Sequence, residues 1–281
     1  MSLTRVFVMT SFAMVAFAGN SLLCRLALKD SQIDAASFTS IRIISGALVL
    51  YLIVRTRRKA TGSFGDWPSA LALFGYAAGF SYAYVNLPAA IGALLLFGAV
   101  QVTMIGYGLS TGERLALRQS AGLVLAFGGL VGLLLPGLSA PPPGGAALML
   151  GAGVAWGVYS IRGKAAGDAT CTTAGNFLRA TPLAVGLNLV MLPASQTATL
   201  GIACAMASGA VTSGIGYAIW YSAIRGLRAT HAATVQLSVP VIAAAGGIVF
   251  LGEAISARLV IASAAILGGV AFVVIEKPSP R

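Results

Sequence analysis

The sequence of 281 residues contains little charge, since Asp, Glu, Lys and Arg together make up 9% of it. Soluble globular domains carry about 25% of these residues, so that class of protein is excluded. Disordered chains are excluded as well, because they combine low hydrophobicity with high charge, whereas this chain is 58% hydrophobic. An integral membrane protein with many spans is the class that remains.

Cysteine, histidine and acidic residues are also scarce. The three cysteines (Cys24, Cys171 and Cys204) have no CxxC or metal-type spacing and there is one histidine, so we expect no disulfide framework, no metal site and no cofactor. No Asp or Glu lies in the middle of an apolar segment. Proton-coupled pumps usually carry an ionisable group there. The absence favours movement of a substrate down its gradient, or an unidentified form of coupling.

Ten apolar segments follow one another, each about as long as the roughly 20 residues that a bilayer-spanning helix needs. Charged residues, Pro and Gly mark the breaks between them. The segments are Arg5–Cys24, Ala35–Val54, Trp67–Asn86, Pro88–Ser110, Ala116–Leu135, Gly144–Ile161, Cys171–Leu192, Thr197–Ala223, Ala229–Leu251 and Ala257–Ile275. We therefore predict an all-α integral membrane protein with ten transmembrane helices.

The basic residues indicate the orientation of the chain, because cytoplasmic loops of membrane proteins are enriched in Lys and Arg. If the N-terminus is cytoplasmic, the cytoplasmic breaks hold 13 of them: Arg5, Arg55, Arg57, Arg58, Lys59, Arg114, Arg118, Arg162, Lys164, Arg225, Arg228, Lys277 and Arg281. The opposite breaks hold three, namely Arg25, Lys29 and Arg258. We therefore expect both termini on the cytoplasmic side of a bacterial inner membrane. The net charge of +11 then reflects topology rather than nucleic-acid binding.

A cleaved signal peptide is the alternative interpretation of the first segment. Arg5, the apolar run after it and Ala16-Phe17-Ala18 resemble a signal-peptidase site. Cleavage would leave nine spans and would disturb the alternation of basic breaks, so we favour a retained first helix.

The two halves of the chain resemble each other at a nearly constant offset of 137 to 140 residues. The matching pairs are Gly19 with Gly157, Ile41-Arg42 with Leu178-Arg179, Gly112-Glu113 with Gly252-Glu253, Leu117-Arg118 with Ala257-Arg258, and Gly128-Gly129 with Gly268-Gly269. A Pro- and Gly-rich stretch separates them, so we predict repeats at 1–136 and 144–281 with a linker at 137–143. Five spans is an odd number, so the second repeat would be inverted, as in many secondary transporters.

These residues resemble those of the drug/metabolite transporter superfamily, in particular its EamA-type members with five plus five helices. The resemblance rests on Ile41-Arg42, Leu178-Arg179, Trp156-Gly157, Leu251-Gly252-Glu253-Ala254 with Thr111-Gly112-Glu113-Arg114, and Pro240. The counterpart of Pro240 in the first half is Gln101, a departure from the family pattern. Within the superfamily the chain is most similar to the exporters of aromatic amino acids and methyl viologen, which implies a transporter without enzymatic activity.

Inverted repeats place the substrate near the midplane, where the halves meet. The candidate substrate-binding residues are therefore aromatic and polar residues of the inner segments: Asn20, Tyr76, Phe80, Tyr82, Gln101, Trp156, Tyr159, Tyr217, Tyr221 and Gln236. The offset also pairs Tyr82 with Tyr221. Ring faces offer apolar area and attract cations, which suits an aromatic side chain or a planar dication. The alternative is packing or an interfacial aromatic belt, which Trp67, Tyr84 and Trp220 suit best near the segment ends.

Arg42 and Arg179 are the basic residues that lie well inside a span. They could clamp a substrate carboxylate or pack against helix-end carbonyls of the opposite half, and we favour the structural role. Glu113 and Glu253 open the fifth and tenth segments, where a carboxylate is stabilised by the helix dipole.

Two glycine patterns have structural explanations. The GxxxG pairs Gly75–Gly79, Gly128–Gly132 and Gly153–Gly157 are expected to form close helix contacts within one subunit rather than a dimer interface. The stretch 108–112 fits the G-x-S-x-G motif of esterases, which needs a strand–turn–helix setting and a catalytic triad. Here the motif ends an apolar segment, so we give it no catalytic role.

The sequence therefore predicts a secondary transporter that exports small metabolites, foremost aromatic or apolar amino acids, by alternating access. Efflux of planar cations such as methyl viologen, or of nucleobases or sugar-like metabolites, is the alternative. A membrane-embedded enzyme is remote, because it would need clustered titratable residues in one plane of the bilayer. The expected partners are a small-molecule substrate and the lipid bilayer. We favour a monomer and leave a dimer open.

Overall fold

The computed structural model describes residues 3–29, 33–56, 64–112, 116–135, 140–164, 167–191, 198–225, 227, 229–254 and 256–274. Every regular element within these ranges is a helix, and no strand occurs in them. The predicted all-helical class is confirmed for this part of the chain.

The helices follow the predicted apolar segments closely. They are α1 (Leu3–Lys29), α2 (Ala35–Thr56), α3 (Trp67–Tyr84), α4 (Ala89–Ser110), α5 (Leu117–Leu134), α6 (Pro143–Lys164), α7 (Ala169–Met191), α8 (Thr199–Ala207), η1 (Ser208–Ile215), α9 (Gly216–Ile224), α10 (Ala229–Val235), α11 (Ser238–Leu251) and α12 (Ala257–Val274). The eighth segment is thus divided among α8, η1 and α9, and the ninth between α10 and α11. That ten helices cross the membrane stays a prediction.

Several of the described helical stretches have the length and surface of membrane spans. Five are both long and apolar enough to cross a bilayer: Thr4–Lys29, Ala35–Thr56, Ala89–Ser110, Pro143–Lys164 and Thr199–Ile224. Large apolar side chains cover the outside of the bundle, and Phe7, Val190 and Phe250 each expose more than 70% of their surface. Soluble monomers rarely leave such surfaces open to water. The apolar helices therefore suit a protein that crosses the membrane several times.

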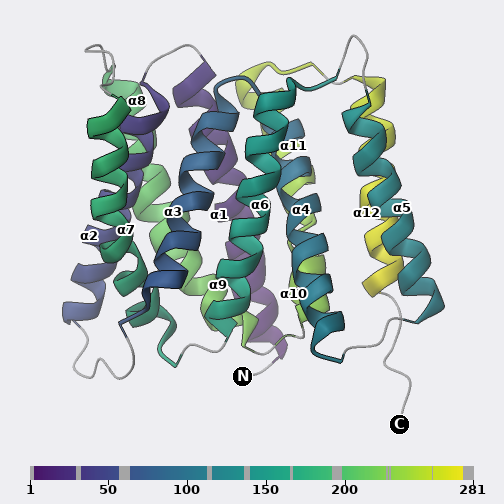
Figure 1. Cartoon of the computed structure of the whole chain (residues 1–281), viewed down its shortest axis with the longest axis horizontal. Coiled ribbons are helices and arrows are strands. Elements are labelled where there is room, and N and C mark those ends of the chain that lie inside the picture. Colours follow the sequence, from purple (N-terminus) through teal and green to yellow (C-terminus); the bar gives the residue numbers. More distant parts are fainter. Residues whose placement is uncertain are drawn as a thin grey trace.

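The helices run roughly parallel to one another, and the two halves of the chain interlock (Figure 1). Helix α2 packs on α7, α3 on α6, α4 on α6 and α11, and α1 on α9 and α11. Each of these contacts joins the first half to the second. Each helix of one half packs on the helix of the other half that its equivalent in the repeat would require. For example, the contact of α4 with α6 is matched by that of α11 with α1. The inversion of the repeat stays a prediction.

Helices α5 and α12 form a pair at one edge of the bundle (Figure 1). Their backbones touch at Gly122 and Gly269, where a Cβ on either residue would overlap the carbonyl oxygen of the other. A Cβ on Gly128 or Gly132 would meet nothing within 4 Å. The predicted close contact at Gly128–Gly132 is therefore wrong, and Gly122 makes the contact that this pair of helices needs.

The other two GxxxG pairs face neighbouring helices of the same chain. A Cβ on Gly79 would lie 3.1 Å from the Leu148 carbonyl oxygen of α6. Gly153 lies against the carbonyl of Leu96 in α4. A Cβ on Gly157 would lie 2.8 Å from Thr103, also in α4. These glycines let α6 approach α3 and α4 closely, as expected of contacts within one subunit.

Candidate functional site

Polar and aromatic side chains gather in the interior of the bundle, where α1, α2, α3, α6, η1 and α9 meet. We call this group the central cluster. Both halves of the chain contribute to it, and each member exposes at most 8% of its surface. The members are Asn20, Arg42, Tyr76, Phe80, Trp156, Ser208, Thr212, Ser213 and Tyr217.

Arg42 lies at the centre of this cluster and is held by hydroxyl groups and ring faces. Its Nε donates to Ser213 Oγ at 3.0 Å, and its Nη2 donates to the hydroxyls of Tyr217 at 2.6 Å and Tyr76 at 3.1 Å. The guanidinium carbon lies 5.1 Å from the centre of the Tyr76 ring and 4.9 Å from that of Phe80. The remaining nitrogen, Nη1, is buried and has no hydrogen-bond partner.

No described carboxylate neutralises Arg42. The acids in the described ranges (Asp34, Asp66, Asp168 and Glu253) all lie at or just beyond helix ends, and none of them forms an ion pair with it. A guanidinium keeps its proton in proteins, and buried charges are normally paired. The described part of the cluster therefore carries an uncompensated positive charge.

Asn20 links α1 to the same network. Its Nδ2 donates to the Tyr76 hydroxyl at 3.1 Å, and its Oδ1 accepts from Ser208 at 2.6 Å and from Thr212 at 3.3 Å. The Tyr217 hydroxyl donates to that of Tyr76, also at 3.1 Å. An amide buried at this depth thus has partners on both its nitrogen and its oxygen, which offsets the cost of removing it from water.

Aromatic rings form the walls of the cluster. The ring centre of Trp156 lies 4.6 Å from that of Tyr217 and 5.0 Å from that of Tyr76. Phe17 packs on Trp156 at 5.2 Å, and Phe177 packs on Tyr217 at 5.9 Å. The cluster therefore combines flat apolar surfaces with one cation and several hydroxyls, a combination suited to a small ligand with an apolar body and a polar end.

The serine and threonine hydroxyls of the cluster come from η1, a π-helix that sequence reasoning did not predict. Its wider turn presents Ser208, Thr212 and Ser213 toward α1 and α2, and π-helical turns are frequent at functional sites. Gly209 makes the close approach possible, because a Cβ there would overlap the backbone oxygen of Arg42. The signal in the sequence is the run of small residues at 208–214. Phe17 and Phe177 were also missed.

Two predicted glutamines adjoin the cluster near the break between α10 and α11. The indole of Trp156 donates to Gln236 Oε1 at 2.7 Å, and Gln236 Nε2 donates to the Ala232 carbonyl at 3.1 Å. Gln101 donates to the carbonyl of Ala233, while its own buried side-chain oxygen has no partner. Pro240 explains the break, because proline lacks the N–H that would continue the helical hydrogen bonds.

The predicted tyrosines outside the cluster have different environments. Tyr221 donates to the Tyr159 carbonyl at 2.7 Å and the two rings pack at 5.0 Å, so this pair lies beside the cluster. Tyr82 is half-buried and forms no ring contact or hydrogen bond with any described residue. The offset pairs the two tyrosines as equivalent positions of the repeat, and that pairing stays a prediction.

The aromatic residues near helix ends also divide into two kinds. Trp67 exposes 54% of its surface, as a belt residue would. Tyr84 and Trp220 are fully buried, with Tyr84 packed on Phe80 at 4.7 Å and Trp220 on Phe17 at 5.8 Å. The belt interpretation is wrong for these two residues.

Arg179 lies apart from the central cluster. It is half-buried and donates to the carbonyls of Gly175, at 3.1 Å, and Phe64. Phe64 lies three residues before α3 in the first half, so Arg179 binds a backbone carbonyl of the opposite half, as in the structural role considered from the sequence. Arg42, its counterpart in the repeat, has no such carbonyl partner among its hydrogen bonds.

Glu253 interacts with the dipole of a different helix from the one expected. Helix α12 begins four residues after it, and the carboxylate accepts instead from the backbone N–H of Ala89, at 2.8 Å, at the start of α4. It also forms an ion pair with Arg25 at 3.2 Å. Glu253 thus joins the second half to α1 and α4. Its counterpart Glu113 lies outside the described residues.

A second ion pair joins the halves near the opposite end of the bundle, between α6 and the start of α3. Arg162, in the last turn of α6, lies 2.8 Å from Asp66, the residue that caps α3. Burial raises the pKa of Asp66, but hydrogen bonds from the Ser69 N–H and Arg162 outweigh that effect. The pKa of Asp66 therefore lies below its ordinary value. Asp66 is therefore ionised at physiological pH.

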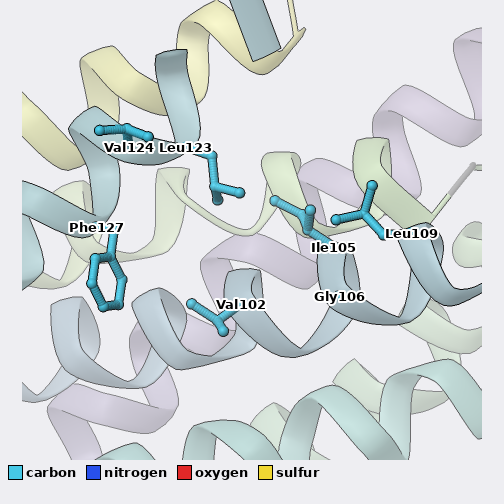
Figure 2. Close-up of a pocket in the computed structure, with 7 residues that line it drawn as sticks. All are labelled: Val102, Ile105, Gly106, Leu109, Leu123, Val124 and Phe127. Carbon is cyan, nitrogen blue, oxygen red and sulfur yellow. The ribbon is translucent and has the colours of Figure 1, made fainter. Parts of the chain in front are cut away.

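An apolar pocket of about 360 Å³ lies between α4 and α5 (Figure 2). Its lining consists of Val102, Ile105, Gly106, Leu109, Leu123, Val124 and Phe127. Several of these side chains are open at the surface, and Val124 exposes 73%. A pocket without polar lining suits hydrocarbon chains and gives a polar solute no partner, so we do not assign the substrate to it.

The similarity of the chain to known proteins agrees with this arrangement. The model of the EamA-like transporter family matches residues 143–275. The chain is 55% identical over 270 residues to the uncharacterized protein PA1977 of Pseudomonas aeruginosa, which covers 96% of this chain and 94% of that protein. The chain belongs to the EamA-like transporter family. A crystal structure described only as that of a protein matches with a TM-score of 0.69 and 23% identity, over 94% of this chain and 98% of that one. That likeness supports the fold alone.

Membership of the EamA-like family identifies the chain as a membrane protein of a transporter family rather than an enzyme family. The expectation that it is not an enzyme is consistent with this. The relationship to exporters of aromatic amino acids and methyl viologen stays a prediction.

Proposed function

We propose that this EamA-like protein is a secondary transporter that exports small metabolites, foremost amino acids with aromatic or apolar side chains. The observation that carries the proposal is the central cluster, which is fully buried, polar at its centre and built by both halves. Polar groups inside a membrane protein are costly and usually mark a substrate pathway.

Transport through the cluster requires it to open to one side of the membrane at a time. Every cluster side chain is buried, so opening would separate the two halves. The ion pairs Arg25–Glu253 and Asp66–Arg162 join the halves near opposite ends of the bundle. We propose that they break alternately as the halves rock about the cluster.

Purified protein in liposomes tests this function. Liposomes loaded with radiolabelled phenylalanine should release it without ATP, faster than liposomes without protein. Trp156→Ala should reduce the rate about 10-fold or more, because it removes the ring that packs on Tyr76 and Tyr217. The control Trp67→Ala alters an exposed tryptophan and should keep the rate within about two-fold. Equal rates with and without protein, for every amino acid tested, would contradict the proposal.

Planar cations are the second candidate substrates, because the rings of Tyr76, Phe80 and Trp156 could stack on them. Methyl viologen added to the same liposomes separates the two classes. Transport of methyl viologen, or its competition with phenylalanine, would favour the cation.

A further inference from the structure

The central cluster contains a buried cation with an unpartnered nitrogen. Arg42 exposes 1% of its surface, and its Nη1 has no hydrogen-bond partner although five N–H donors are available on a guanidinium. Its other two nitrogens bind neutral hydroxyls. No described acid pairs with it. A buried charge left in this state is stabilised when an ion of opposite sign arrives.

The geometry around Arg42 suits a carboxylate. Nη1 is unpartnered, and the neighbouring Nη2 is held by the Tyr76 and Tyr217 hydroxyls, which already bond to each other at 3.1 Å. These hydroxyls can both donate and accept, so they keep a partner if a ligand takes Nη2. A carboxylate bound across the two nitrogens would form the bidentate pair that guanidinium groups favour.

We propose that Arg42 binds a carboxylate of the transported substrate, so that the substrates are small organic carboxylates with an apolar or aromatic body. This inference rests on the proposed transport function, and it names the substrate class. The body packs on Trp156 and Tyr217. A planar dication is excluded from this class, because Arg42 repels it and no described carboxylate offers it a partner.

The second half of the chain supplies a comparison for this assignment. Arg179 occupies the equivalent position 137 residues later in the sequence. Its Nη1 is occupied by the Phe64 and Gly175 carbonyls, and its side chain is partly exposed. The same residue type therefore carries a free buried donor in one half only, which makes Arg179 the matched control.

Direct binding to the purified full chain in detergent tests the inference without relying on transport. The probes are phenylalanine, 3-phenylpropionate, phenylethylamine and methyl viologen, measured by calorimetry. We expect the two carboxylates to bind and the two cations not to bind. Arg42→Gln should weaken carboxylate binding about 10- to 100-fold, since it removes a charge-assisted pair. The affinity of Arg42→Lys for the carboxylates should lie between those of the wild type and Arg42→Gln. Arg179→Gln should bind like the wild type.

Each other outcome overturns the inference. Failure of both carboxylates to bind, phenylethylamine binding as tightly as 3-phenylpropionate, or unchanged binding by Arg42→Gln would do so. Unfolding of Arg42→Gln is checked by its thermal transition, and Arg42→Lys then carries the comparison. The transport function fails separately: carboxylate binding without flux in liposomes would contradict export and leave the Arg42 site intact. Flux that does not depend on Arg42 would contradict the Arg42 site and leave export intact.

Discussion

Arg42 and Arg179 differ in ways that the repeat alone does not reveal. Equivalent residues of a repeated sequence share a position along their helices, but they share an environment only if every neighbour is repeated too. Arg42 faces hydroxyls supplied by η1, α3 and α9, whereas Arg179 faces the backbone before α3. The asymmetry suggests that one arginine serves the ligand and the other serves the fold.

Replacement of Arg42 by methionine should leave the stability of the empty protein unchanged or raise it. Replacing a buried charge by an apolar residue of similar volume is often neutral or stabilising. The Tyr76 and Tyr217 hydroxyls would still bond to each other, and Asn20 would still donate to Tyr76. Thermal unfolding of Arg42→Met in detergent, without ligand, measures this. A fall of more than about 5 °C, roughly 2 kcal/mol for a chain of this size, would identify Arg42 as a structural residue.

The chemistry of the residues predicted most members of the central cluster, but its serines became evident only from the structure. Asn20, Tyr76, Trp156 and Tyr217 stand out in the sequence because polar and aromatic groups are costly or conspicuous inside apolar helices. Ser208 and Ser213 do not stand out, because small hydroxyl residues are common wherever membrane helices pack. Tyr82 and Tyr221 have different environments although the repeat offset pairs them, because equivalent positions need not have equivalent neighbours.

At the scale of elements, hydrophobic runs located the helices, while local backbone chemistry decided where they break. The break between α10 and α11 has a sequence cause in Pro240. The π-helix η1 contains no proline, and its widened turn is stabilised by contacts with α1 and α2 that are distant in sequence. A run of small residues permits such a turn but does not specify it.

Gly122 and Gly128 provide a matched test of the α5–α12 contact. Gly122→Ala should destabilise the protein by about 1–3 kcal/mol, because its new Cβ would overlap the backbone of Gly269. Gly128→Ala adds the same methyl group where nothing lies within 4 Å, so its stability should change by less than about 1 kcal/mol. Chemical or thermal unfolding of both variants measures the difference. Equal effects of the two substitutions would refute the observed register of α5 on α12.

At the scale of the whole molecule, the halves interlock through helix pairs and are joined by ion pairs near both ends. This arrangement encloses the cluster completely. The low charge and the repeat offset predicted a membrane protein built from two related halves. They did not predict that Glu253 would cap α4, because that contact depends on how the second half lies against the first.

Solutes that cross the membrane through the central cluster would expose it to water on each side in turn. A cysteine placed there, Ser213→Cys, reports this exposure in a chain whose three native cysteines are replaced. Ser40→Cys is the control. Ser40 lies on α2 and is buried like Ser213, but it bonds to Ala184 of α7 and lies outside the central cluster.

A membrane-impermeant thiol reagent is applied to one face of oriented vesicles at a time. We expect Ser213→Cys to react from either face and saturating phenylalanine to slow the reaction, while Ser40→Cys stays unreactive. A cysteine at 213 that reacts from neither face, or no faster than the one at 40, would contradict a pathway through the cluster.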